Sequence, residues 1–277
     1  MSERGRWNVD PWNRALWWPG GAVHGHLIVG TQLADFTAEA SAELPGYPAG
    51  NLRSVAHPRR GWRATAGADL AVVCTLTTPV RVTGVVIPWT NAAHVAIDLS
   101  TDGTTWAPVD PMPLPTYVDP RTERRKLCWW APDPAAPFSA AVRLRTFGTP
   151  LPGDTLEVGA VAVVAARFEL TQNVGFPITW TIIRPATRVD FTDGSVEWNA
   201  EGPPRLRYQF QSPVWRGDRP TMPELLTIVH GAKGRPIVID ENRGNPAAVY
   251  VGTIAEDFTA AERFAVFDAG LVFEEFG

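Results

Sequence analysis

The sequence is poor in cysteine, has no long apolar run and carries no excess of charge of one sign. Only Cys74 and Cys128 are cysteines among its 277 residues. No stretch approaches the ~20 apolar residues that a membrane-spanning helix needs. Residues 1–20 also lack the apolar core of a signal peptide. We therefore expect synthesis in the cytoplasm and no insertion into a membrane.

The charge balance excludes one class of partner. The chain has 25 Lys and Arg residues against 29 Asp and Glu residues, a formal net charge of -4. Binding to nucleic-acid phosphates depends on a basic surface. We therefore expect no sequence-specific contact with nucleic acid.

The two cysteines lie in apolar runs that are typical of strands, LAVVCTL around Cys74 and KLCWW around Cys128. Buried free thiols are the simpler interpretation, because a cytoplasmic chain of this size needs no disulfide for stability. A disulfide remains open as the alternative if the two strands are neighbours.

Signatures of catalysis are also missing. The sequence contains no GxSxG, no HExxH, no Gly-rich phosphate loop and no Cys–His pair at a useful spacing. The acidic pairs Asp240-Glu241 and Glu274-Glu275 read as solvated strand ends, although two distant acids would suffice for a glycosidase. His24 and His26 have no further metal ligands near them. We predict no enzyme, no catalytic residues, no cofactor and no metal site.

Proline, glycine and tryptophan are abundant, with 26, 24 and 12 residues. Helical patterns are few, and this combination predicts an all-β chain of short strands and tight turns. The length favours two domains, which we place at residues 31–165 and 166–277 after a Trp-rich arm over residues 1–30. The arm must bury four indoles, within the chain or in assembly with another subunit: Trp7, Trp12, Trp17 and Trp18.

The clearest element of the first domain is the run Trp89–Trp106. Over His94–Ser100, apolar and polar residues alternate as in a strand with one buried face. A turn follows, in which Asp102 can bond the backbone and Gly103 can take positive φ. Trp106 then returns to the apolar phase, so we expect it, like Trp62, in the core. Further strands are expected over Leu70–Thr77, Val80–Pro88, Ala141–Phe147 and Leu156–Val164.

This domain resembles the discoidin, or F5/8 type C, family of galactose-binding-like jelly rolls. The resemblance covers about residues 30–165 and is carried by Asn51-Leu52, Trp62-Arg63-Ala64, Thr90-Asn91 and Ser100-Thr101-Asp102-Gly103 before Trp106. It implies that a ligand would lie in loops at one end of the sandwich. Some members hold calcium after the Asn-Leu position, but Arg53-Ser54 supplies no carboxylate here.

The family's ligand loops map onto Gly46–Asn51, His57–Gly61 and Trp89–His94. Aromatic faces there could stack on a sugar while cationic and amide groups bond its hydroxyls. Trp89 could equally be a core residue, and the two arginines a solvated turn. The candidate carbohydrate-binding residues are Tyr47, His57, Arg59, Arg60, Trp89, Asn91 and His94.

The charge run Arg121–Lys126 lies in a proline-rich segment and predicts an exposed, solvated excursion between strands. An acidic partner surface is the alternative for this run.

The second domain shows one helix, in which Thr221 and Glu224 form a capping box before an apolar stripe that ends at Gly231. Strands are expected around it, with a tight turn at Thr192-Asp193-Gly194: Arg167–Thr171, Ile178–Ile183, Ala186–Phe191, Ser195–Asn199, Arg205–Phe210, Pro236–Asp240, Ala248–Ile254 and Arg263–Glu274.

This order of elements resembles the tail-tube-like split barrel of distal tail proteins in tailed-phage baseplates. The resemblance rests on the 192–194 turn, the helix MPELLTIVHGAKG, the YVGTI strand and the closing LVFEEF. It implies a homohexameric ring around a DNA channel, with tail tube and hub proteins as partners and the jelly roll facing outward for host attachment. In the usual order the barrel comes first in the chain, whereas here the jelly roll leads. The N-terminal arm could restore the usual arrangement by contributing a strand to the barrel.

Two functions therefore compete. The first is a structural tail-tip or baseplate component of a phage or phage-like particle, assembled in the host cytoplasm and located in the virion tail. The second is a carbohydrate-binding module that recognises a host cell-surface glycan without ring assembly. They differ in oligomeric state, because only the first requires a ring.

Overall fold

The computed structural model describes residues 28–57, 60–67, 70–119, 124–132, 137–147, 154–169, 175–183, 186–190, 195–200, 205–215, 235–240, 248–254, 259–262 and 266–276. The four arm tryptophans, Arg59, the 192–194 turn and the helix expected from Thr221 lie outside these residues. Within them the chain is all-β, as predicted, apart from the short 3-10 helix η2 (Ala49–Arg53). No helix of the described residues is long and apolar enough to cross a membrane.

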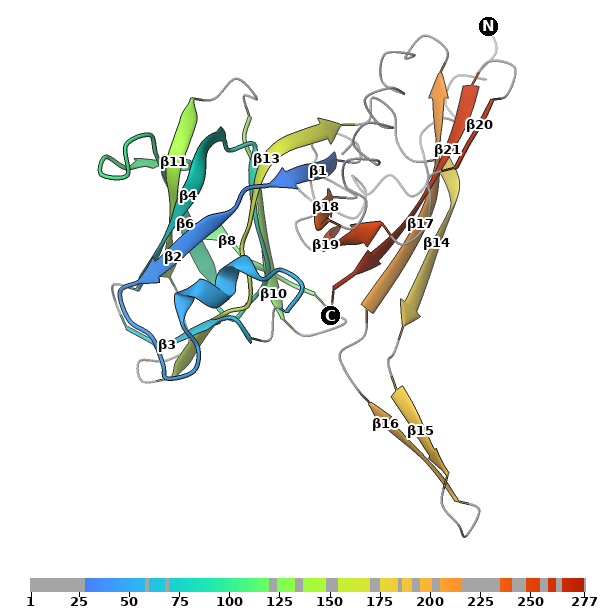
Figure 1. Cartoon of the computed structure of the whole chain (residues 1–277), viewed down its shortest axis with the longest axis horizontal. Helices are drawn as coiled ribbons and strands as arrows, with labels where there is room; N and C mark the ends of the chain where they lie inside the picture. Colours follow the sequence, from blue (N-terminus) through green and yellow to red (C-terminus); the bar gives the residue numbers. More distant parts are fainter. Residues whose placement is uncertain are drawn as a thin grey trace, which may run out of the picture.

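The first half of the chain forms a sandwich of two facing layers (Figure 1). One layer is a six-stranded sheet: β2 (Phe36–Ala40), β4 (Ala71–Arg81), β11 (Phe138–Phe147), β6 (His94–Ser100), β7 (Ala107–Pro108) and β8 (Leu114–Pro115). The other layer belongs to a larger sheet: β3 (Trp62–Thr65), β12 (Thr155–Val158), β5 (Gly84–Thr90), β10 (Arg125–Trp130), β9 (Tyr117–Val118) and β13 (Ala162–Glu169). The core between the layers is apolar and includes Leu52, Trp62, Ile87, Ile97 and Leu144.

The strand expected over Leu156–Val164 is two strands, β12 and β13. The break lies where backbone N–H groups leave the ladder: Gly159 N donates to Trp89 O at 2.8 Å, and Val161 N donates to Leu52 O at 2.9 Å. The chain thereby steps from β3 at one edge to a position beside β5.

The larger sheet continues beyond the sandwich into the C-terminal part of the chain. β1 (Ile28–Leu33) pairs with β13 on one side and with β18 on the other. The sheet then runs outward through β18 (Ile237–Asp240), β19 (Val249–Ile254), β21 (Val266–Glu275), β17 (Arg205–Trp215) and β14 (Gly175–Ile183), with β20 (Thr259–Glu262) also on β21. The expected domain boundaries near residues 30 and 165 thus fall within β1 and β13. The split barrel itself stays a prediction.

A second apolar cluster lies behind the sandwich, between β5, β13 and the C-terminal strands. Val86, Trp130, Val164, Val238 and Val251 belong to it. Because Val85 and Ile87 face the first core while Val86 faces the second, β5 is buried on both sides. This explains the unbroken apolar run of its sequence.

One hairpin stands apart from these sheets. β15 (Ala186–Asp190) and β16 (Val196–Ala200) form a separate two-stranded sheet, in which Val189 pairs with Glu197. Figure 1 shows the hairpin projecting from the ends of β14 and β17. Strands were expected here over Ala186–Phe191 and Ser195–Asn199, and the structure has them with slightly different bounds.

The Trp89–Trp106 prediction is confirmed in its strand and turn and corrected in its burial. β6 spans His94–Ser100, and Gly103 has a φ of 79°. Asp102 Oδ1 accepts the backbone N–H groups of Thr104 and Thr105, both at 2.7 Å, and these bonds lower the pKa of that carboxyl. However, Asp98 on the supposedly wet face is 1% exposed, because Arg143 and Arg145 cover it.

Trp106 was expected in the core, and this is wrong. It lies under Arg143, whose guanidinium carbon is 4.6 Å from the ring centroid.

Cys74 and Cys128 are free thiols, as the simpler interpretation predicted. Burial raises the pKa of the Cys74 thiol to about 12, and burial together with the nearby Asp240 carboxylate raises the pKa of Cys128.

Candidate functional site

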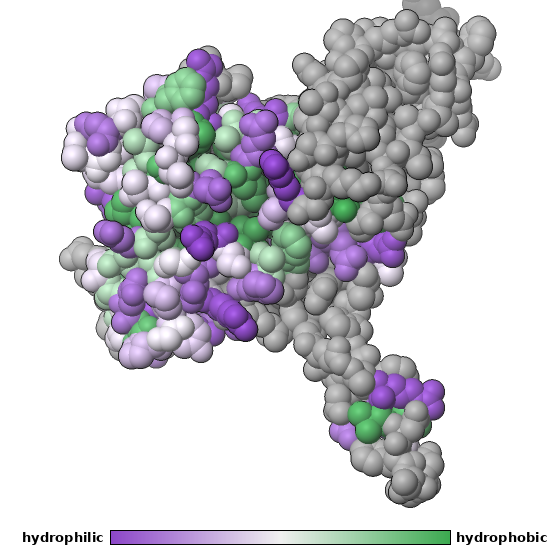
Figure 2. Space-filling model, viewed as in Figure 1, coloured by the Kyte–Doolittle hydropathy of each residue, from purple (hydrophilic) through white to green (hydrophobic). Residues whose placement is uncertain are grey.

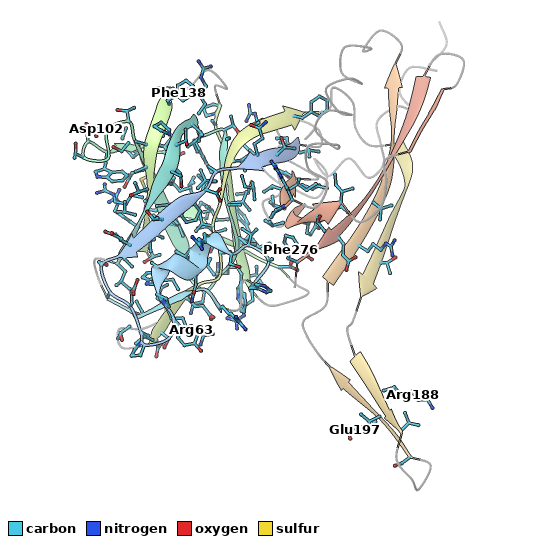
Figure 3. All side chains as sticks on the ribbon, viewed as in Figure 1. Arg63, Asp102, Phe138, Arg188, Glu197 and Phe276 are labelled. Carbon is cyan, nitrogen blue, oxygen red and sulfur yellow. The ribbon has the colours of Figure 1, made fainter. Side chains whose placement is uncertain are left out.

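A line of five side chains crosses the outer face of β3, β12 and β5. An aromatic ring stands at each end with three charged groups between them, and we call it the aromatic–arginine row: Tyr47, Arg63, Glu157, Arg124 and Trp89. Arg63 and Glu157 face outward because their neighbours Trp62 and Leu156 are fully buried in the core. Figure 3 shows Arg63 at the end of the sandwich far from Asp102.

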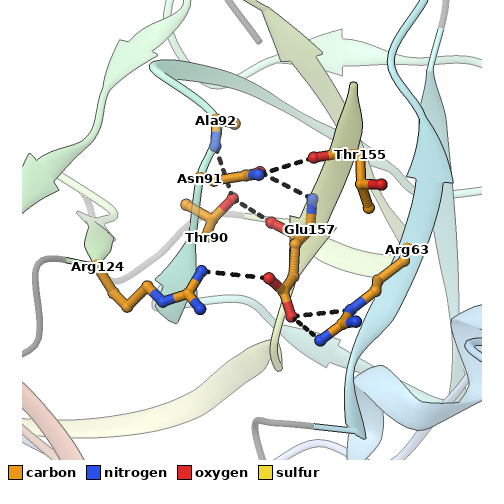
Figure 4. A network of polar contacts seen from close by, with 7 residues as sticks. All are labelled: Arg63, Thr90, Asn91, Ala92, Arg124, Thr155 and Glu157. Carbon is orange, nitrogen blue, oxygen red and sulfur yellow. Dashed lines mark hydrogen bonds and ion pairs between the residues drawn. The ribbon is translucent and has the colours of Figure 1, made fainter. Parts of the chain in front are cut away.

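Glu157 is the centre of the row. It lies directly opposite Arg63 in the β3–β12 register. Its Oε1 accepts Arg63 Nε at 2.9 Å and Nη2 at 2.6 Å, while its Oε2 accepts Arg124 Nη1 at 3.2 Å (Figure 4). The Glu157 side chain is 8% exposed, against 29% for Arg63 and 42% for Arg124. The carboxylate is therefore recessed between two accessible guanidinium groups.

Each guanidinium of the row also lies over an aromatic ring. The Arg63 guanidinium carbon is 4.1 Å from the Tyr47 ring centroid, and that of Arg124 is 4.6 Å from the Trp89 centroid. Such cation–π contacts restrict the flexible arginine side chains by placing each guanidinium group over a ring.

Trp89 carries an unsatisfied donor. Its Nε1 is buried and has no hydrogen-bond acceptor among the described residues. An unpaired buried N–H group costs on the order of 1–3 kcal/mol.

Asn91 holds the backbone of β12 on both sides of the row's central residue. Its Nδ2 donates to Thr155 O and its Oδ1 accepts Glu157 N, both at 2.8 Å (Figure 4). Thr90 adds a bond from its Oγ1 to Glu157 O at 2.8 Å. Both polar ends of Asn91 are engaged with β12, so this side chain positions Glu157 and offers little to a ligand.

The other sequence-predicted residues lie apart from the row. His57 and Arg60 are exposed in the turn between η2 and β3. His94 is exposed at the start of β6, in the opposite sheet, where it pairs with Phe147. The structure therefore brings together Tyr47, Trp89 and Asn91 and leaves the three others outside.

Sequence reasoning missed the charged members of the row. Arg63 was part of a fold motif, and Arg124 was part of a charge run expected to be solvated. Glu157 is the only charged residue in the apolar run LEVGAVAVV, and this was the signal that could have identified it. Its partners could not be found, because β3 and the β9–β10 connection are distant in sequence.

Lys126 belongs to the same charge run, which was expected to be solvated. It is instead buried, with 4% of its surface exposed. Its Nζ lies 2.9 Å from Asp119 Oδ2 and 3.1 Å from both Glu275 Oε1 and Val249 O. It also lies 4.8 Å from the Tyr250 ring centroid. These contacts fasten the C-terminal strands to the sandwich, beside which Figure 3 places Phe276.

The chemistry available to the row is that of recognition. It offers planar donors, two aromatic rings and one carboxylate that is already neutralised by its neighbours. The described residues include no group of three or more His, Cys, Asp and Glu side chains that could hold a metal ion. The surface can bind a polar ligand by stacking and by charge-assisted hydrogen bonds.

Comparison with known proteins gives similarity of structure alone. No protein-family model matches the chain, and no curated protein matches it. The N-terminal domain of the single-strand break repair protein XRCC1 is 15% identical, with 49% of this chain and 98% of that chain covered and a TM-score of 0.39. Chitosan-binding module 1 of the Paenibacillus sp. IK-5 chitosanase/glucanase is 17% identical, with 51% and 99% covered and a TM-score of 0.37. A CBM32 module of Clostridium perfringens, solved with GalNAc-β-1,3-galactose, is 11% identical, with 47% and 95% covered and a TM-score of 0.37.

Proposed function

We propose that this protein is a non-catalytic glycan-binding protein and that the aromatic–arginine row is its binding surface. The observation that carries the proposal is the pairing of Tyr47 and Trp89 with two accessible guanidinium groups around Glu157. Sugars present apolar C–H faces beside hydroxyl groups, so they bind where aromatic rings adjoin planar hydrogen-bonding groups.

A purely structural explanation of the row accounts for only part of it. A cross-strand pair such as Arg63–Glu157 stabilises an edge strand by roughly 0.2–1 kcal/mol. This explains why an arginine and a glutamate face each other on β3 and β12. It does not require Arg124, the two aromatic supports or the unpaired N–H of Trp89.

The proposal predicts that the full chain binds glycans on a glycan array and that Trp89→Ala lowers the affinity for the best ligand at least tenfold. A tenfold loss corresponds to about 1.4 kcal/mol, which is within the range for removing one stacking aromatic ring. Trp106→Ala is the matched control, because Trp106 also lies under an arginine but on the opposite sheet. An array without hits, or equal losses for the two variants in calorimetry, would reject the proposal.

A second candidate is the structural tail-tip component, and the hairpin β15–β16 favours it. Two isolated strands are at best marginally stable in water, and this hairpin forms its own two-stranded sheet. Val196 on it is 44% exposed, and Figure 2 shows hydrophobic beside hydrophilic residues there. We propose that a neighbouring subunit packs on the hairpin in a hexameric ring that joins tail tube and hub proteins in a virion tail. In that arrangement the jelly roll would face outward.

The oligomeric state tests this second candidate. Light scattering on purified protein should show a closed oligomer, and Val196→Lys should shift it toward the monomer because the charge would be buried in the contact. Met112→Lys serves as the control, since Met112 is also an exposed apolar residue, at 69%, but lies on the sandwich. A monomer at all concentrations, or equal behaviour of the two variants, would contradict the ring.

A further inference from the structure

The start of β10 joins the aromatic–arginine row to the C-terminal strands. Arg124, just before the strand, donates to Glu157 of the row at 3.2 Å. Two residues later, Lys126 Nζ donates to Val249 O on β19 and to Glu275 Oε1 on β21, both at 3.1 Å. One short segment therefore contacts both the candidate binding surface and the C-terminal part of the chain.

The pairing of β5 with β10 is irregular at the same place. The register shifts by one residue between Arg125 and Leu127, so that Lys126 alone stands opposite Pro88 and Trp89 of β5. A β-bulge of this kind changes the direction of the side chains at the bulge. The direction in which the Trp89 ring points therefore depends on how β10 is held at Lys126.

Lys126 is held from both parts of the chain by directional contacts. Its ammonium group lies 2.9 Å from the carboxylate of Asp119, which follows β9 of the sandwich, and it also bonds to Glu275 and to the Val249 carbonyl. Stability alone does not require charges here, because apolar side chains of similar volume often replace a buried ion pair without loss. The charged contacts add a defined position for Lys126 relative to the C-terminal strands.

We propose that Lys126 is a positioning residue of the aromatic–arginine row. By holding β10 to the C-terminal strands, it fixes the β5 bulge and with it the orientation of Trp89, so that these strands are needed for full glycan affinity. This inference rests on the proposed glycan-binding function. Lys126 is 4% exposed and does not reach a ligand on the row, so it acts only through its neighbours.

The test separates affinity from stability. Calorimetry of the full chain with its best glycan from the array should show at least fivefold weaker binding for Lys126→Met. Adding Asp119→Asn and Glu275→Gln should recover part of the stability in urea denaturation, because the charges left without a partner are then removed. The triple variant should nevertheless bind the glycan as weakly as the single variant, since the directional contacts of Lys126 are still missing.

Trp130→Ala is the matched control. Trp130 also joins β10 to the C-terminal strands, through the bond from its Nε1 to Asp240 on β18 at 2.7 Å. It stands at the far end of β10, about 13 Å along the strand from Lys126. The control should lower stability and leave the glycan affinity within twofold. Equal losses of affinity for Trp130→Ala and Lys126→Met, or native affinity in the triple variant, would overturn the positioning role.

Hydrogen–deuterium exchange of the native chain gives a second readout that needs no variant. Coupling between two sites is reciprocal, so a glycan bound on the row should also slow exchange in Val249–Ile254, the strand that Lys126 holds. Slowed exchange in Gly84–Thr90 without any change in Val249–Ile254 would overturn the positioning role and leave the glycan-binding function intact. Binding of no glycan at all by the native chain would remove both.

Discussion

Replacing Lys126 with methionine should lower the free energy of unfolding by about 3–5 kcal/mol, the usual cost of removing one partner from a buried ion pair. The substitution keeps the apolar stem but leaves Asp119 and Glu275 without the ammonium group between them. It also removes the bond to Val249 O, which joins the sandwich to β19. Urea denaturation followed by circular dichroism measures the change.

The matched control for this prediction is Arg81→Met. Arg81 is an exposed cation whose guanidinium lies 5.2 Å from the Phe138 ring centroid, so its loss should cost about 1 kcal/mol or less. Adding Asp119→Asn and Glu275→Gln to Lys126→Met should restore part of the loss, because the uncompensated charges are then removed. Equal losses for the two single variants would show that Lys126 does not hold the two parts of the chain together.

Trp130→Ala should destabilise the protein by about 3–5 kcal/mol, the range found for removing large aromatic side chains from a core. Trp130 lies in the second apolar cluster, and its Nε1 donates to the buried Asp240 carboxylate at 2.7 Å. Two glycines make room for its ring, since a Cβ at Gly84 would overlap it and a Cβ at Gly30 would lie 3.1 Å from its edge.

A double-mutant cycle tests this packing directly. Gly84→Val should cost about 1–3 kcal/mol in the native background, because overpacking forces the indole aside. In the Trp130→Ala background the same change should cost much less, since the cavity accepts the added methyl groups. Additive effects of the two substitutions in thermal denaturation would show that the ring and the glycine do not meet.

The sequence predicted local structure well in segments where apolar and polar residues alternate with a single period. β6 has the expected bounds, and the Asp102–Gly103 turn has the expected bonds and positive φ. β5 could be recognised as apolar, but its burial on both faces depends on β1 and the C-terminal strands packing behind it. Periodicity describes one strand at a time and contains no information on which distant strand covers it.

The binding surface was only half predictable for the same reason. Tyr47 and Trp89 attract notice as aromatic residues in loops, yet the groups that complete the row come from three distant segments. Arg63 and Glu157 meet only through the β3–β12 register. Asn91 was a good candidate by residue type, but the structure uses both ends of its amide to hold β12. Lys126 was hidden because a charge run normally indicates solvent.

Hydrogen–deuterium exchange of the full chain, with and without its best glycan, tests the central claim most directly because it locates the ligand. The glycan-binding account predicts slowed exchange in peptides covering Tyr47–Arg63, Gly84–Thr90 and Thr155–Val158. Exchange in β4 and β11 of the opposite sheet should not change. Protection confined to β4 and β11, or the absence of any glycan that slows exchange in the row, would contradict the account.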